Sequence, residues 1–172
     1  MQKRRIEHTF DCEPHTYWEG AFFNPEYNAK LFLERLRFER WELIEQVDTD
    51  DGFRRIIEAV PRVGDLPGPI KSLLKNGAGY REEGEFFRSE SRYRLRVTSR
   101  SLGDKLLVTG DMSVRALDGG RCRRGYECAV DAKVFGVGGM IERRVLDDWE
   151  RSYRKAAEFT ASWLSDNALT SG

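Results

Sequence analysis

Residues 137–164 decide the fold, and they read VGGMIERRVLDDWERSYRKAAEFTASWL. Apolar and small residues recur there in steps of three and four: Ile141, Val145, Trp149, Tyr153, Ala156, Ala157, Thr160, Trp163 and Leu164. This spacing predicts one α-helix with a continuous apolar face. The opposite face is charged and carries Glu142, Arg143, Asp147, Glu150, Arg151, Arg154 and Glu158. A helix far longer than the average of about 11–12 residues needs a broad apolar partner surface, which the rest of the chain must supply.

Composition restricts the class of protein. The chain has 172 residues, of which 40% are hydrophobic and 34% charged, a balance typical of one globular domain. Lys+Arg and Asp+Glu number 29 each, so no overall positive charge indicates nucleic acid as a partner. No apolar run reaches the roughly 18–20 residues of a membrane span. We expect a single domain over residues 1–166 and a frayed tail, small and polar, over residues 167–172.

The cysteines and the first residues bear on location. Cys12, Cys122 and Cys128 are odd in number and lack the spacing of a metal site, which favours free thiols. Residues 1–8 include basic side chains but have no apolar stretch behind them, unlike a secretory signal. Together these features predict a reducing, cytoplasmic location.

Upstream of the long helix the hydrophobic period changes to two in most segments. Strands are expected over residues 3–11, 38–47, 53–63, 80–88, 91–99, 105–116 and 121–135. Two short helices are expected after the first strand, over residues 16–22 and 26–36. The prolines of Gly64–Pro69 predict an irregular loop, and Ile70–Leu74 is expected to form one or two helical turns ended by Asn76-Gly77.

The order of one strand, two short helices, six strands and one long helix resembles the START-like superfamily, also called the helix-grip or polyketide cyclase/dehydrase and lipid-transport fold. Two short motifs carry the local resemblance. VFGVGGMIE at residues 134–142 is similar to the strand-to-helix junction of a bacterial branch of unknown function. Asn24-Pro25-Glu26-Tyr27 resembles the start of the second helix in that branch.

The resemblance implies an α+β helix-grip fold. Its curved, seven-stranded antiparallel sheet would wrap around the long C-terminal helix and leave an elongated cavity between the two. Members of the superfamily mostly bind lipids, sterols, polyketides or other hydrophobic molecules, and some are enzymes. The fold alone does not decide between binding and catalysis.

Charged residues on the inner faces of strands mark the candidate site. Strict alternation places Arg55, Glu82 and Arg124 inward, together with His8 on the first strand. Because a buried charge needs a partner, a ligand or water, an inward arginine could hold a carboxylate or phosphate while aromatic rings hold an apolar body. A one-residue slip or a bulge would instead turn each charge to solvent. The expected ligand-binding residues are Arg55, Glu82, Tyr93, Arg124, Tyr126, Trp149 and Tyr153.

One basic stripe stands out on an expected strand, formed by Arg92, Arg94, Arg96 and Arg100. It could make a transient contact with an anionic membrane surface or meet an acidic partner. The alternative is a solvated sheet face, with the arginines paired to Glu83 and Glu85 of the preceding strand.

No catalytic arrangement is readable, because His8 and His15 are the only histidines and no nucleophile motif or phosphate loop accompanies them. We expect no catalytic residue, no metal and no cofactor.

The leading hypothesis is carriage of a hydrophobic, lipid-like small molecule without catalysis. One alternative is an enzyme of the polyketide cyclase or aromatase kind, with Arg55, Glu82 or Tyr126 polarising a carbonyl. Another is a structural or interaction protein with a filled interior. The sequence leaves the oligomeric state open.

Overall fold

Seven strands in the described part of the chain form one antiparallel sheet, ordered β1-β7-β6-β5-β4-β3-β2. The computed structural model describes residues 1–62, 64, 68–74 and 77–171. The strands are β1 (Gln2–Phe10), β2 (Arg40–Asp48), β3 (Gly52–Val60), β4 (Tyr80–Phe87), β5 (Arg92–Ser99), β6 (Gly103–Leu117) and β7 (Arg121–Ala132). Strands β2 to β7 follow one another across the sheet, and β1 pairs with β7.

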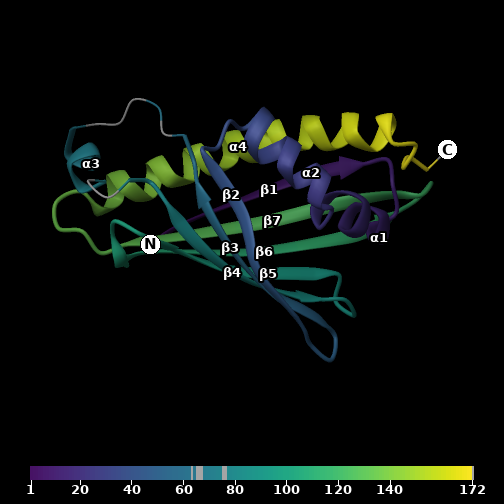
Figure 1. The fold of residues 1–172 in the computed structure, drawn as a ribbon, viewed down its shortest axis with the longest axis horizontal. Coiled ribbons are helices and arrows are strands. Elements are labelled where there is room, and N and C mark those ends of the chain that lie inside the picture. The colour runs from purple at the N-terminus through teal and green to yellow at the C-terminus, as the bar shows by residue number, and fades with distance from the viewer. Residues whose placement is uncertain (63, 65–67, 75–76, 172) are drawn as a thin grey trace.

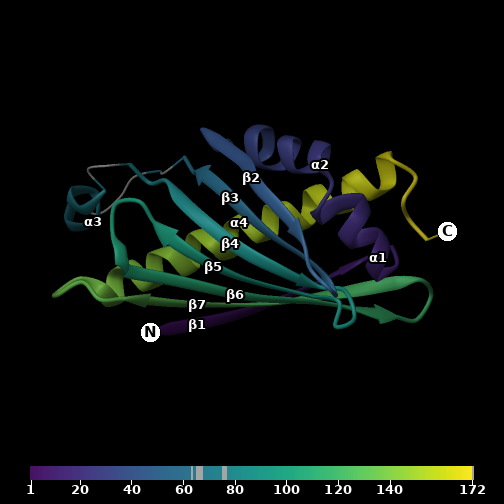
Figure 2. The same cartoon turned by 60° about the horizontal axis from the view of Figure 1, so that its bottom comes forward.

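The helices lie against one face of this sheet (Figure 1). They are α1 (Pro14–Thr16) and the π-helix η1 (Tyr17–Phe22), α2 (Pro25–Ala29) and the π-helix η2 (Lys30–Arg35), α3 (Gly68–Leu73) and α4 (Gly138–Asp166). Figure 2 shows α4 crossing the sheet, with α1 and α2 near its C-terminal end and α3 near its beginning. The predicted α+β helix-grip fold, with two short helical segments after the first strand, is confirmed.

Two glycines shape the inner face of the sheet. Gly84 on β4 and Gly110 on β6 flank Leu95 of β5 in one cross-strand row. A Cβ at Gly84 would overlap the Tyr93 hydroxyl, and a Cβ at Gly110 would come within 2.6 Å of the Tyr126 hydroxyl. Both tyrosine rings therefore lie across a neighbouring strand, which only glycine permits at these positions.

The buried face of α4 is wider at its start than the sequence predicts. Glu142, expected on the charged outer face, is only 5% exposed. Its Oε1 accepts the Ala132 backbone N–H at 3.0 Å and lies 3.0 Å from the Met1 amine. The expectation for Glu142 is wrong because the turn after β7 brings the first turn of α4 back onto the end of that strand, where a carboxylate pairs an otherwise unbonded backbone donor.

Three arginines of the stripe along β5 and just after it form ion pairs, with partners other than those expected. Register places Glu85 opposite Arg94 and Glu83 opposite Arg96. The ion pairs of the stripe instead join Arg92 and Arg94 to Asp111 and Glu90, and Arg100 to Glu58. The stripe is therefore part of a mixed-charge outer surface of the sheet.

The end of the chain returns to the fold. Leu169 packs against the aromatic core, and the Ser171 backbone N–H donates to the Asp11 carbonyl at 2.8 Å. The division into residues 1–166 and a frayed tail stays a prediction. The centre of the expected Gly64–Pro69 loop, Asn76 of the expected helix end and the last residue, Gly172, lie outside the described residues. None of the helices within the described ranges has the length and apolarity that crossing a membrane requires.

Candidate functional site

A cavity of about 500 Å³ lies between the inner face of the sheet and α4. Its apolar wall comes from the strands, from α4 and from the segments around α2 and α3, and it includes Phe22, Leu31, Phe32, Trp41, Ile57, Ile70, Leu95, Val97, Val108, Ile141, Val145, Trp149 and Ala156. Tyr27, Tyr80, Tyr126 and Tyr153 add rings with a polar end. The alternative of a filled core predicts no such space, and a ligand-binding interior requires one.

The structure brings most of the expected site residues to this cavity. Arg55, Glu82, Arg124, Tyr126, Trp149 and Tyr153 line it. Tyr93 is not on the wall, since it is fully buried behind it and bonds to two of the lining residues. Arg55 and Arg124 are only 6% and 2% exposed, so both strands keep the alternation that places these residues on the inner face of the sheet. Whether these residues contact a ligand stays a prediction.

Arg55 belongs to a compensated cluster. Its Nε donates to the Tyr93 hydroxyl at 2.8 Å, and that hydroxyl donates to Glu82 Oε1 at 2.8 Å. The Arg55 guanidinium also lies 4.8–5.0 Å from the ring centres of Phe22, Phe23 and Tyr93. Burial, and then the charge of Glu82, raise the pKa of the Tyr93 phenol well above its ordinary value, so the phenol is neutral. Glu82 Oε1 lies 3.9 Å from Arg55 Nη2, which balances the buried positive charge.

Arg124 is buried without such compensation. Its Nη1 donates to the Tyr17 hydroxyl at 3.0 Å, and its Nη2 bonds to His8 Nδ1 at 2.9 Å. Its guanidinium lies 5.2–5.8 Å from the ring centres of Phe10, Tyr17 and Tyr153. Burial first, and then the charge of Arg124, lower the pKa of His8 to about 4, so His8 is a neutral acceptor near pH 7. Among the described residues no carboxylate forms an ion pair with Arg124.

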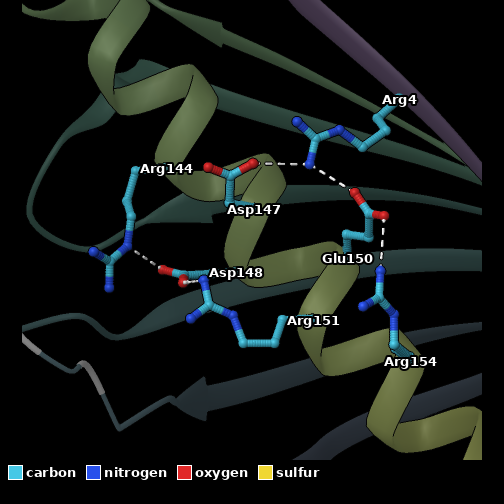
Figure 3. A network of polar contacts seen from close by, with 7 residues as sticks. All are labelled: Arg4, Arg144, Asp147, Asp148, Glu150, Arg151 and Arg154. Carbon is cyan, nitrogen blue, oxygen red and sulfur yellow. Dashed lines mark hydrogen bonds and ion pairs between the residues drawn. The ribbon is translucent and has the colours of Figure 1, made fainter.

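The α4 side of the cavity carries further charges (Figure 3). Asp148 accepts from Arg144 Nε at 2.7 Å and from Arg151 Nη2 at 3.1 Å, and all three residues line the cavity. These are helix neighbours at spacings of three and four residues. They present a mainly basic edge to the cavity.

A second network in Figure 3 fastens α4 to the edge strand β1. Arg4 Nη1 bonds to Asp147 at 2.9 Å and to Glu150 at 2.7 Å, and Glu150 also bonds to Arg154 at 3.3 Å. This network holds the position of the helix over the sheet. It does not border the cavity.

Sequence reasoning missed the contribution of the short helices. Tyr17 of η1 holds Arg124, and Tyr27 and Asn28 of α2 line the cavity. Tyr27 is fixed by a 2.7 Å hydrogen bond between its hydroxyl and Thr160 of α4. The available signal was the aromatic run of residues 17–23, but no periodicity tells which strand such a helix faces. Within the described ranges there is no group of three or more His, Cys, Asp or Glu side chains placed to hold a metal ion.

Solved structures share this architecture. The protein TTHA0849 from Thermus thermophilus aligns over 96% of this chain and 99% of its own, with a TM-score of 0.67 and 13% identity. The Zhui aromatase/cyclase from Streptomyces sp. R1128 aligns over 94% and 93%, with a TM-score of 0.65 and 10% identity. Norcoclaurine synthase from Thalictrum flavum, in complex with dopamine and hydroxybenzaldehyde, aligns over 91% and 83%, with a TM-score of 0.61 and 14% identity. At these identities the likeness is one of fold.

Comparison at the level of sequence places the chain in a family. No curated protein matches it. Residues 5–164 match a family model described as "Protein of unknown function (DUF2505)". This match covers the sheet, the short helices and nearly all of α4. The chain therefore belongs to the DUF2505 family, and its fold is the helix-grip fold.

Proposed function

We propose that this protein binds one apolar small molecule in the cavity between the sheet and α4. The observation that carries the proposal is the cavity itself, which measures about 500 Å³ and has a wall of aromatic and aliphatic side chains. Small-molecule sites of proteins are typically about 300–1,000 Å³, largely apolar, and interrupted by a few fixed polar groups. Arg55, Glu82 and Arg124 are such groups here.

The polar groups favour holding a ligand over transforming it. In the Arg55–Tyr93–Glu82 cluster each group already has a partner, which suits a rigid wall that orients a bound molecule. Neither histidine lines the cavity: His8 bonds to Arg124, and His15 Nε2 lies 3.3 Å from the Thr16 hydroxyl on the surface. The lipid-like nature of the ligand and the cytoplasmic location stay predictions.

Native mass spectrometry of the purified protein tests this proposal, followed by solvent extraction and identification of any released molecule. We expect a protein mass increased by one small apolar molecule, or a higher melting temperature with members of a panel of fatty acids, fatty alcohols, sterols and aromatic polyketides. A clean mass without adduct, together with no shift across the panel, would falsify the proposal.

Catalysis is the second candidate, and one observation favours it: Arg55, Glu82 and Tyr126 all line the same cavity. The Zhui protein of the same fold is described as an aromatase/cyclase. A cyclase of this kind would convert a linear poly-β-ketone thioester into a cyclic product with loss of water. Incubation of such a thioester with catalytic amounts of protein, followed by mass spectrometry, tests this candidate. Turnover that disappears in Glu82→Gln would support it, and unchanged substrate would leave ligand binding as the function.

A further inference from the structure

Arg124 differs from the other buried arginine in one respect. Both guanidiniums lie against three aromatic rings. Arg55 also has Glu82 at 3.9 Å, whereas the hydrogen-bond partners of Arg124 are the neutral groups of Tyr17 and His8. Burying a cation without a counter-charge costs several kcal/mol even after relaxation. Arg124 lines the cavity and is only 2% exposed. The fold therefore lacks one negative charge beside the Arg124 guanidinium.

The unsatisfied polar atoms of the interior indicate the same chemistry. Within the described residues, two buried side-chain polar atoms lack a hydrogen-bond partner, Arg124 Nε and Trp149 Nε1. Both belong to residues that line the cavity, and both are donors. Because buried donors without an acceptor are costly, the missing group must accept hydrogen bonds.

The charges along the wall also favour an anion. The chain as a whole is neutral, with 29 basic and 29 acidic residues. The described cavity wall carries Arg55, Arg62, Arg124, Arg144, Arg151 and Lys155, against only Glu82 and Asp148. A cleft lined mainly by one sign of charge concentrates ligands of the opposite sign and speeds their entry.

We propose that the ligand is an apolar carboxylic acid, whose carboxylate accepts from Arg124 while its hydrocarbon body lies among the rings between the sheet and α4. This inference rests on the proposed function and deepens it by naming the ligand class. A single negative charge matches the single uncompensated cation. The basic edge formed by Arg144, Arg151 and Lys155 draws the acid in from solvent.

Matched ligands on the wild-type protein provide the test. Isothermal titration calorimetry at pH 7.5 compares decanoate with decanol and methyl decanoate, and 2-naphthoate with 2-naphthylmethanol. The two series distinguish aliphatic from aromatic acids. We expect at least one acid to bind about tenfold or more tightly than its neutral counterparts. A tenfold difference in affinity corresponds to the smallest contribution that a hydrogen bond to a charged group typically makes.

A pair of variants locates the effect. Arg124→Met removes the cation and keeps an apolar chain, so the preference for the acid should disappear. Arg123→Met is the control, because Arg123 is the neighbouring residue of β7 and is exposed on the other face. The comparison of ligands on the wild-type protein requires no variant, so it stands even where Arg124→Met does not fold.

Three outcomes overturn the inference. Equal affinity for acid and neutral ligand would refute the carboxylate while leaving the proposed function intact. A preference for the acid that survives in Arg124→Met would place the anion elsewhere. Absence of binding by every ligand in both series, on a protein that also carries no adduct, would overturn the inference together with the proposed function.

Discussion

At the scale of single residues, the interior is organised by two buried arginines and the rings around them. The ring of Phe22 in η1 contacts the Arg55 guanidinium, and its centre lies 6.2 Å from the ring centre of Tyr17. Tyr17 of the same helix bonds to Arg124. One short helix therefore contacts both buried arginines. The hydrogen-bond partners of these cations determine how the protein responds to pH and to small changes of side-chain volume.

His8 should make the protein sensitive to acid. Its pKa is about 4 in the folded state against 6.5 for an ordinary histidine, so the unfolded chain takes up the proton first as the pH falls. His8 therefore does not affect stability above pH 6.5, and it lowers stability progressively between pH 6.5 and about 4. His8→Asn keeps an acceptor for Arg124 and removes the titration. Urea unfolding at pH 7.5 and pH 4.5 should show a smaller loss of stability for His8→Asn than for wild type.

The exposed His15 provides the control for this measurement. His15→Asn should lose as much stability between the two pH values as wild type does. If His8→Asn also behaves like wild type, the low pKa assigned to His8 is wrong.

Gly84 should not tolerate a side chain. In Gly84→Ala the new Cβ would overlap the Tyr93 hydroxyl, so the ring must move and its hydrogen bonds to Arg55 and Glu82 must break. We expect a loss of about 2–4 kcal/mol in the free energy of unfolding, from overpacking and from polar groups left unpaired. Gly139→Ala is the control, because a Cβ there meets nothing within 4 Å and alanine favours the helix. Equal urea midpoints for the two variants would contradict this account.

At the scale of elements, the sequence predicts what depends on periodicity and misses what depends on neighbours. The period of two correctly predicted that Arg55, Glu82 and Arg124 point inward. A one-residue slip in a sheet with one covered face would turn the apolar side chains of a strand to solvent, so the register is fixed. The length of α4 followed from an unbroken helical pattern. The burial of Glu142 did not follow, because it depends on the turn after β7 rather than on the helix itself. The role of Tyr17 was missed for the same reason, since it requires knowing which strand η1 faces.

The start of α4 should depend on the acceptor at residue 142. Glu142→Ala leaves the Ala132 backbone N–H without its partner, which should lower the free energy of unfolding by about 1–3 kcal/mol. Glu142→Gln keeps a side-chain oxygen and should lose less than half as much. Chemical denaturation of the three proteins at pH 7.5 measures the difference. If Glu142→Ala is as stable as wild type, the buried hydrogen bond does not contribute to stability.

At the scale of the whole molecule, α4 is attached to the rest of the fold at separate points, and a space remains between the helix and the sheet. The Arg4 network fastens the helix to β1, while Tyr27 fastens it to α2. Between these attachments the helix and the sheet leave a cavity of about 500 Å³. A fold selected only for stability would fill such a space, because empty volume forfeits packing energy. Under the proposed function a ligand occupies this volume, so the volume is the property to alter.

Filling the cavity should separate binding from stability. Val97 of β5 is partly buried and lines the cavity, so Val97→Phe places a ring in the empty volume. The added apolar contact should leave the melting temperature unchanged or raise it by a few degrees. The same ring should weaken binding of 8-anilinonaphthalene-1-sulfonate, an apolar anion, at least about tenfold by competing for space.

Thr98→Phe is the control, because residue 98 points to the opposite face of the sheet. If Val97→Phe binds the dye as wild type does, the dye does not occupy the cavity. If Val97→Phe unfolds at a much lower temperature, the space around Val97 is too small to admit a ring and cannot hold a ligand of this size.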